Sequence, residues 1–235
     1  MTLAARDTRL RELMDDPDCD LARLHTTLRR FSVVNRLVSG WGAVYRSRVE
    51  PHLRRLGRPA RVLDLGCGGG DVIARLAALA RREGLVAEWV GVDPDERALA
   101  VARRYAGPGI RFEATDSAAL RAAGERFDLV VSNHVLHHLD EAAFAAFRDD
   151  SLALVEGGPR GLVLHGDIAR GRAAYGLYAV GITPLAPGSF LRTDGLRSIR
   201  RSFTAPELAD ALGPGWRVEQ PAPFRVLAVA EGRDA

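Results

Sequence analysis

The chain of 235 residues carries 33 arginines, no lysine and 30 acidic residues, which gives a formal net charge of +3. The arginines are scattered among Asp and Glu, so the composition argues against a nucleic-acid-binding surface. A hydrophobic content of 47% indicates a globular protein, and the N-terminus lacks an apolar segment, so we expect a cytoplasmic protein without a signal peptide or membrane span. Cys19 and Cys67 lie far apart in sequence, and we expect both to be free thiols.

Residues 1–57 precede the first predicted strand and are expected to form a helical extension. Asp20 is placed to cap a helix whose apolar residues recur at helical spacing, until glycines on both sides of Trp41 interrupt the pattern. Two interpretations remain open. The extension either packs its apolar stripe on the rest of the domain or acts as a lid, in which Phe31, Trp41 and Tyr45 help to close over bound ligands.

The stretch from Arg61 to Gly70 combines a short apolar run with a glycine-rich turn. Val62, Leu63 and Leu65 have the apolar character of a buried parallel strand. An apolar-periodic helix then starts at Asp71. A glycine turn between a strand and a helix N-terminus presents free backbone amides and the positive end of the helix dipole to a ligand. The stretch therefore predicts a nucleotide-binding turn.

The glycine spacing separates two classes of nucleotide-binding protein. A dinucleotide-binding turn has the pattern G-x-G-x-x-G, but Asp71 stands at the third position after Gly66 and Gly68. The pattern from Asp64 to Gly70 instead resembles motif I of the class I S-adenosylmethionine (SAM) methyltransferases. A carboxylate at Asp64 suits the methionine ammonium of SAM and would repel a pyrophosphate. An NAD-dependent oxidoreductase remains the alternative from another enzyme class.

The next two predicted strands also end in acidic residues. Residues 88–93 form an apolar strand ending at Asp93, close to the offset of roughly 20 residues at which a carboxylate meets a ribose in nucleotide-binding folds. Residues 110–116 form the third strand, and the resemblance implies that Asp116 and Ser117 contact the adenine amino group. Asp116 is alternatively a helix N-cap.

A fourth strand, residues 127–133, is followed by His134, His137 and His138. The segment resembles motif IV of the same family, which lines the methyl-transfer face. The sequence Ser132-Asn133-His134-Val135 replaces the Asn/Asp-Pro-Pro-Tyr of nucleic-acid amine methyltransferases and argues against such a substrate. We expect no metal, because no matching carboxylate or cysteine cluster accompanies the histidines. His134 and His137 are candidates for a general base, since imidazole titrates near neutral pH.

The fifth predicted strand, residues 161–167, ends with His165 and Asp167. The carboxyl ends of the strands line the ligand crevice in an open α/β sheet, so His165 is a third candidate base. The alternative is a buried histidine that is satisfied by a neighbouring residue.

Residues from about 170 to 201 interrupt the regular alternation with an apolar, partly aromatic insertion. In the resembled family, an insertion before the last helix builds the acceptor pocket, which implies an apolar, aromatic or lipid-like acceptor. Thr204 and Glu207 have the spacing of a capping box at the start of the last helix. Residues 216–219 and 224–230 alternate in hydrophobicity and are expected to form a closing hairpin.

Together these elements predict an α/β fold with a Rossmann-like, seven-stranded, mostly parallel sheet, helices on both faces, an N-terminal helical extension and a cap insertion before the last helix. The methyltransferase domain is expected to cover residues 58–232. The resemblance implies SAM as the cofactor and O-methylation of a small, apolar, phenolic or quinol (polyketide- or lipid-like) acceptor. C- or N-methylation of another metabolite, nucleic-acid methylation and a non-catalytic SAM-binding module remain alternatives. The residues assigned to the cofactor are Asp64, Gly66, Cys67, Gly68, Gly70, Asp93, Pro94, Asp116, Ser117, Asn133 and His134.

Overall fold

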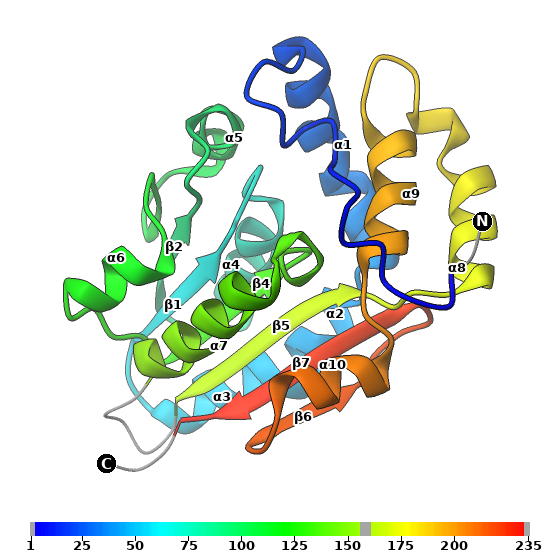
Figure 1. Cartoon of the computed structure of the whole chain (residues 1–235). Helices are drawn as coiled ribbons and strands as arrows, with labels where there is room; N and C mark the ends of the chain where they lie inside the picture. Colours follow the sequence, from blue (N-terminus) through cyan, green and yellow to red (C-terminus); the bar gives the residue numbers. More distant parts are fainter. Residues whose placement is uncertain (1–2, 156–160, 233–235) are drawn as a thin grey trace.

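The computed structural model describes residues 3–155 and 161–232, and a single seven-stranded sheet runs through it (Figure 1). The strands are β1 (Ala60–Leu65), β2 (Ala87–Val92), β3 (Ile110–Glu113), β4 (Leu129–Asn133), β5 (Leu162–Ile168), β6 (Trp216–Glu219) and β7 (Arg225–Glu231). Their order is β3-β2-β1-β4-β5-β7-β6. β1 to β5 are parallel, whereas β7 runs antiparallel to both β5 and β6. The predicted sheet is confirmed, and its order reverses between β1 and β4, where open α/β sheets bind their ligands.

Both faces of the sheet are covered because apolar residues alternate along the strands. In β1, Val62 packs with α4 (Asp71–Arg82) on one face, and Leu63 packs with α6 (Ser117–Ala122) and α7 (Glu141–Val155) on the other. α10 (Ala205–Leu212) begins with the predicted capping box of Thr204 and Glu207 and covers β6 and β7 on the side of α7. The sequence Gly157-Gly158-Pro159 predicts the end of the helix after β4, and it lies outside the described residues.

The N-terminal extension is helical from Leu21 onward, and its part from Trp41 to Leu53 packs into the core, whereas residues 3–20, also expected to be helical, form no helix. It comprises α1 (Leu21–Val38), capped by Asp20, then α2 (Trp41–Val44), the π-helical turn η1 (Tyr45–Val49) and α3 (Glu50–Leu56). The helical segment continues through Pro51, which has no backbone N–H to donate. The wider π-helical turn η1 lies directly before this proline. Trp41 and Tyr45 are 1% and 2% exposed and pack under the sheet, so for these two residues the packing interpretation is correct and the lid alternative is not.

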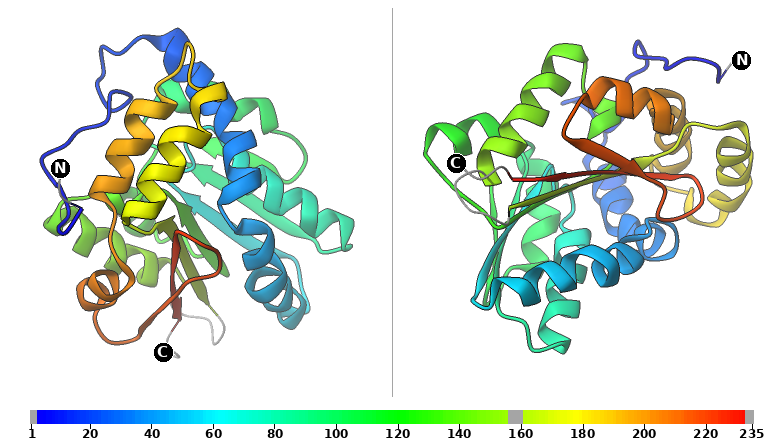
Figure 2. Two further views of the ribbon diagram at one scale, coloured as in Figure 1. Left: turned by 90° about the vertical axis from the view of Figure 1, so that its right-hand side faces the viewer. Right: turned by 90° about the horizontal axis from the view of Figure 1, so that it is seen from below.

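The insertion after β5 folds into helices beside α1. Residues 170–201 contain α8 (Arg172–Gly181), the 3-10 turn η4 (Thr183–Leu185) and α9 (Leu191–Arg201), which stand together with α1 at the carboxyl ends of the strands (Figure 2). The amide of Phe190 donates to the hydroxyl of Thr27 in α1, which fixes the two segments together. The N-terminal segment before α1 runs along α9, where the amides of Leu13 and Met14 donate to the carboxylate of Asp194.

The remaining elements are short. They are α5 (Glu96–Ala102) and the 3-10 turns η2 (Arg103–Tyr105) and η3 (Leu136–His138). Cys19 and Cys67 are both free thiols, as predicted. Among the described helices, none is both long enough and apolar enough to cross a bilayer.

Candidate functional site

The glycine turn after β1 has the backbone that the sequence predicts. Gly66 has φ +69° and Gly70 has φ +73°, a region that residues with a Cβ rarely adopt. A Cβ on Gly66 would lie 2.6 Å from Cγ2 of Val135, in the segment after β4. The turn therefore needs glycine both for its backbone angles and because the two loops at the switch point approach each other closely.

Asp64, at the end of β1, is a buried carboxylate without an adequate partner. Its residue is 1% exposed, and neither carboxylate oxygen makes a hydrogen bond of normal geometry within the described part of the chain. Burial, together with the charges of Asp71 and Asp93, raises its pKa well above the ordinary value, and the amide of Ile73 offsets this only in part. Because Asp64 lines the cavity described below, the site fits a ligand that brings a positive charge.

Asp93 follows β2 and connects the glycine turn to the next loop. Its Oδ2 accepts a hydrogen bond of 2.9 Å from the amide of Gly68, and its Oδ1 accepts one of 2.9 Å from the amide of Asp95. Asp93 and Pro94 both line the cavity. Each carboxylate oxygen retains a lone pair, so Asp93 can also accept hydrogen bonds from ligand hydroxyl groups.

Not every residue assigned to the cofactor reaches the cavity. Gly66, Cys67, Gly68, Asn133 and His134 line it, whereas Gly70, Asp116 and Ser117 do not. Asp116 is the N-cap of α6, where its carboxylate accepts from the amide of Ala119 at 2.9 Å, and the hydroxyl of Ser117 donates to Asp150. The structure thus shows the helix-capping alternative at this position and does not place Asp116 at the cavity wall.

His134 faces the cavity, but both of its ring nitrogens have charged neighbours. Arg225 donates from Nη1 to Nε2 of His134 at 3.0 Å, and Nδ1 lies 3.9 Å from Oδ1 of Asp167. Burial, with the positive charge of Arg225, lowers the pKa of His134 well below its usual value. The lone pair that a general base would use is therefore already taken by Arg225.

His165 lies in the core, so the expectation that it faces the crevice is wrong. It is fully buried, its Nδ1 lies 2.8 Å from the hydroxyl of Ser132, and its ring packs between Phe147 and Trp216. Burial lowers its pKa to about 3, so the ring stays neutral. The buried-histidine alternative is the correct one.

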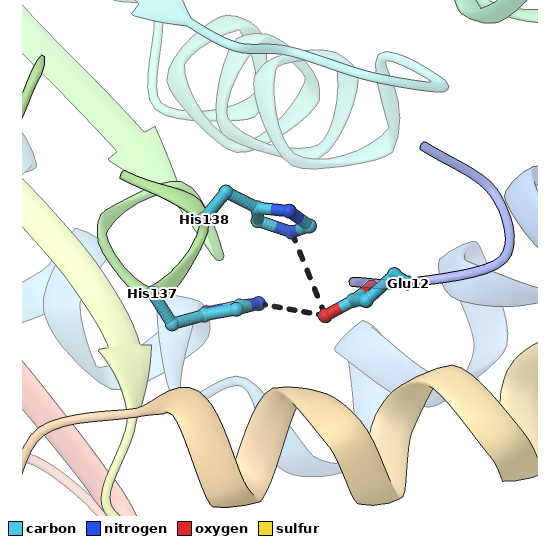
Figure 3. Close-up of side chains that lie close together, drawn as sticks. All are labelled: Glu12, His137 and His138. Carbon is cyan, nitrogen blue, oxygen red and sulfur yellow. Dashed lines mark ion pairs between the residues drawn. The ribbon is translucent and has the colours of Figure 1, made fainter. Parts of the chain in front are cut away.

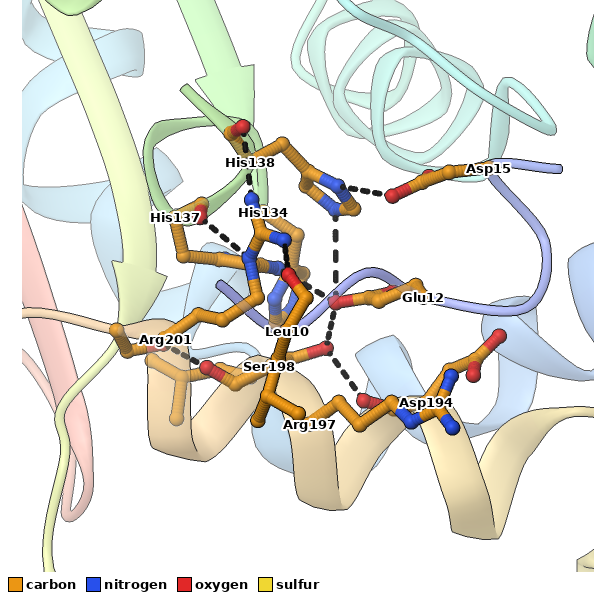
Figure 4. Close-up of polar contacts among 12 residues, drawn as sticks. Leu10, Glu12, Asp15, His134, His137, His138, Asp194, Arg197, Ser198 and Arg201 are labelled. Carbon is orange, nitrogen blue, oxygen red and sulfur yellow. Dashed lines mark hydrogen bonds and ion pairs between the residues drawn. The ribbon is translucent and has the colours of Figure 1, made fainter. Parts of the chain in front are cut away.

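His137 lies at the centre of a buried polar network (Figure 4). Its Nδ1 lies 2.7 Å from Oδ1 of Asp167, and its Nε2 lies 3.3 Å from Oε1 of Glu12. Burial alone would lower the pKa of His137, but the two carboxylates raise it to about 9. On the neighbouring ring of His138, Nδ1 lies 3.2 Å from Oδ2 of Asp15.

Arg201, at the end of α9, fastens this network to the N-terminal segment. Its guanidinium donates to the carbonyl oxygens of His137 at 2.9 Å and His138 at 2.8 Å, and also to that of Leu10. Sequence reasoning missed Glu12 and Asp15, and no sequence signal connects these two residues to the histidines.

One cavity of about 1110 Å³ joins the glycine turn, His134 and the polar groups around Glu12. At one end lie the glycine turn, Asp64 and Asp93; at the other lies an apolar wall from α1 and the helices of the insertion, including Phe31, Leu177 and Leu185. Glu12, His137 and His138 contribute polar groups to the same cavity. The arrangement can hold a polar nucleotide-like ligand and an apolar molecule side by side in one continuous cavity.

Comparisons with known proteins agree with this geometry. Residues 62–158 match a family described as a methyltransferase domain. The ubiquinone biosynthesis O-methyltransferase of Brucella ovis is 33% identical over 135 residues, which is 56% of this chain and 50% of that protein. The protein of the same name from Cereibacter sphaeroides is 34% identical over 125 residues, 52% of this chain and 46% of its own length. The chain thus spans about half the length of the curated relatives that it matches.

Solved structures share the fold over most of the chain. The plantazolicin methyltransferase BpumL in complex with SAH has a TM-score of 0.60 at 12% identity and covers 91% of this chain and 95% of its own. Human N-acetylserotonin methyltransferase in complex with SAM also has a TM-score of 0.60, at 14% identity, and covers 87% of this chain and 54% of its own. Residues 62–158 thus match a methyltransferase domain, and the sheet order and glycine turn agree with the fold that the chain shares with the solved methyltransferases.

Proposed function

We propose that this protein binds SAM at the glycine turn and transfers its methyl group to the oxygen of a small, apolar, phenolic or quinol acceptor. The observation that carries the proposal is the continuous cavity from the turn to the helices of the insertion. Its volume of about 1110 Å³ exceeds the roughly 300–1,000 Å³ of a common single-ligand site, so cofactor and acceptor fit together. The relatives named as ubiquinone biosynthesis O-methyltransferases support oxygen as the methylated atom.

The residues at the turn fit the chemistry of SAM at two points. Asp64 is a buried carboxylate without a cationic partner among the described residues, and the methionine ammonium would supply the positive charge. Asp93 is held by two backbone amides and retains acceptor capacity for two ribose hydroxyls. The contacts of Asp64 with the ammonium and of Asp93 with the ribose would orient SAM, which has no phosphate and so needs no phosphate-binding group.

The acceptor end supports a reaction that depends on alignment and the exclusion of water. When bound, SAM supplies a methyl carbon on a positively charged sulfur, so the C–S bond breaks as the C–O bond forms and the hydroxyl proton leaves. The apolar walls contributed by α1 and α8 exclude water and orient the acceptor. His138, which lines the cavity beside Glu12, is the group placed to take up the proton.

The test combines cofactor binding with a search for the labelled product. Purified protein is titrated with S-adenosylhomocysteine (SAH) and with NADH, then incubated with methyl-labelled SAM and a panel of phenols and quinols. We expect SAH to bind more tightly than NADH and the label to enter an organic-extractable product, in which mass spectrometry finds an O-methyl group. Tighter NADH binding, or label confined to added nucleic acid or protein, would refute the proposal.

Asp93→Asn is expected to weaken SAH binding by about 10- to 100-fold, because charge-assisted hydrogen bonds of about 1.5–3 kcal/mol are lost. Isothermal titration calorimetry gives the dissociation constant. Asp116→Asn is the matched control: it makes the same change at a capping residue outside the cavity and should leave SAH affinity unchanged. A similar loss in both variants would restore the prediction that Asp116 contacts the adenine.

A further inference from the structure

Three side chains from distant parts of the sequence converge on one point of the cavity wall (Figure 3). Oε1 of Glu12 lies 3.3 Å from Nε2 of His137 and 3.8 Å from Nε2 of His138. The potential ligand atoms of these three residues all lie within 4.8 Å of one another. Glu12 comes from the N-terminal segment and the histidines from η3, which explains why the sequence alone predicts no metal.

Both imidazole rings are oriented by a second carboxylate on the opposite nitrogen. Nδ1 of His137 lies 2.7 Å from Asp167, and Nδ1 of His138 lies 3.2 Å from Asp15. A histidine that binds a metal ordinarily donates its other ring N–H to a carboxylate or carbonyl, which fixes the tautomer and directs the free lone pair at the ion. A bound metal ion would need this neutral tautomer of His137 in place of the protonated ring, and both Nε2 lone pairs would then face the same oxygen of Glu12.

In that tautomer the two Nε2 atoms and Oε1 of Glu12 are all acceptors, and the hydroxyl of Ser198, 2.6 Å from Oε1, donates to Glu12 but, in the part of the chain that the structure describes, to neither Nε2. Nε2 of His137 is buried and makes no hydrogen bond of normal geometry within the described residues. The nearby guanidinium of Arg201 is directed at backbone carbonyl oxygens and forms no ion pair with Glu12 in the described structure. A cation at the centre of the cluster would satisfy both nitrogens and the carboxylate together.

We propose that Glu12, His137 and His138 bind a divalent first-row transition metal ion, with Zn²⁺ as the reference ion. Two imidazole nitrogens and one carboxylate are ligands typical of Zn²⁺ and Fe²⁺, whereas Mg²⁺ and Ca²⁺ prefer oxygen atoms. Zinc bonds of about 2.0–2.1 Å at tetrahedral angles place ligand atoms roughly 3.3 Å apart. The separations of 3.3 and 3.8 Å from Oε1 need only a small adjustment.

A second grouping, His134 with His137 and Asp167, is less suitable. Its ligand atoms also lie within 4.8 Å of one another, but Arg225 donates to His134 and Asp167 Oδ1 already accepts from the amide of Ile168 as well as facing His137. A positively charged guanidinium beside a ligand nitrogen disfavours a cation there. Asp167 is therefore the group that orients His137 and not a ligand.

The proposed ion would have two consequences. The ion would hold the N-terminal segment against η3, because Glu12 belongs to that segment whereas His137 and His138 belong to η3. The remaining coordination position of the ion faces the cavity, where the ion would bind the acceptor oxygen as an oxyanion. This second consequence rests on the proposed methyl transfer, whereas metal binding itself does not.

The experiment uses the full-length protein without a histidine tag, stripped of metal with a chelator and titrated with ZnCl₂ by calorimetry. We expect one equivalent of Zn²⁺ per chain. Glu12→Gln and His138→Ala should each weaken Zn²⁺ binding by at least about 10- to 100-fold. His25→Ala removes a histidine of α1 that is outside the cluster and should leave the affinity unchanged. Zn²⁺ should also slow proteolysis of the N-terminal segment in the parent protein but not in Glu12→Gln.

Two results would overturn the proposal. One is the absence of stoichiometric Zn²⁺ binding, and the other is binding that Glu12→Gln and His138→Ala leave unaltered; in either case the cluster is a protonated ion-pair network. SAH binding to the metal-free protein is measured in parallel, since it tests the proposed function independently. Failure of zinc binding with intact SAH binding removes only the metal site.

Discussion

Gly66→Ala is expected to lower the free energy of unfolding by about 2–5 kcal/mol and to abolish measurable SAH binding. The positive φ of +69° contributes roughly 1–2 kcal/mol of strain for a residue with a Cβ. The new methyl group would also lie 2.6 Å from Cγ2 of Val135, and overpacking of this kind costs about 1–3 kcal/mol. The collision separates the loops after β1 and β4, and both of these loops line the cavity. Urea unfolding and calorimetry measure the two effects.

Gly84→Ala provides a control that separates backbone strain from the collision. Gly84 also has φ +69°, but an added Cβ would meet no atom within 4 Å. We expect a loss of only about 1–2 kcal/mol in Gly84→Ala, with SAH affinity unchanged. The double variant Gly66→Ala/Val135→Ala should recover part of the lost stability, because the shorter side chain removes the collision. Equal losses at Gly66 and Gly84 would show that close approach at the switch point is unimportant.

The cofactor end of the site could be predicted because its information is local in sequence. Asp64, Gly66 and Gly68 belong to one strand–turn–helix unit, and Asp93 directly follows the strand that comes after it. Short connections and right-handed crossovers leave these residues little freedom in where they meet. The structure accordingly places all four at the cavity.

The polar cluster could not be predicted, because tertiary packing creates it. Glu12 reaches His137 because two side chains of α9, Arg201 and Asp194, hydrogen-bond to the backbone of the N-terminal segment. The periodicity of the sequence predicts neither of these contacts. The wrong prediction for His165 has a related cause. Its position along β5 directs the ring toward α7 and β6, where Phe147 and Trp216 enclose it. Being near the carboxyl end of a strand does not decide which face a side chain occupies.

Asp64→Asn is expected to change stability and cofactor affinity in opposite directions. Burial raises the pKa of Asp64, so the folded protein retains a proton that the unfolded chain releases above about pH 4. The unfolding free energy therefore falls as pH rises from the unfolded pKa towards the folded pKa. An amide lacks this titration, so the cofactor-free variant should become more stable relative to the parent protein as pH rises from 4 to 8. Its SAH affinity should fall about 10- to 100-fold, through loss of a charge-assisted contact with the methionine ammonium.

Asp210→Asn is the matched control, because Asp210 is exposed on α10 and the substitution makes the same change of charge. It should alter neither the pH dependence of unfolding nor SAH affinity. If Asp64→Asn left SAH affinity intact, the buried carboxylate would have no role in recognising the cofactor. If instead SAH affinity falls while the cofactor-free variant gains stability, the burial of the Asp64 carboxylate lowers the stability of the protein and at the same time serves cofactor binding. A carboxylate that the fold buries without a partner then costs stability until a cationic ligand arrives, and part of the binding free energy comes from relieving that cost.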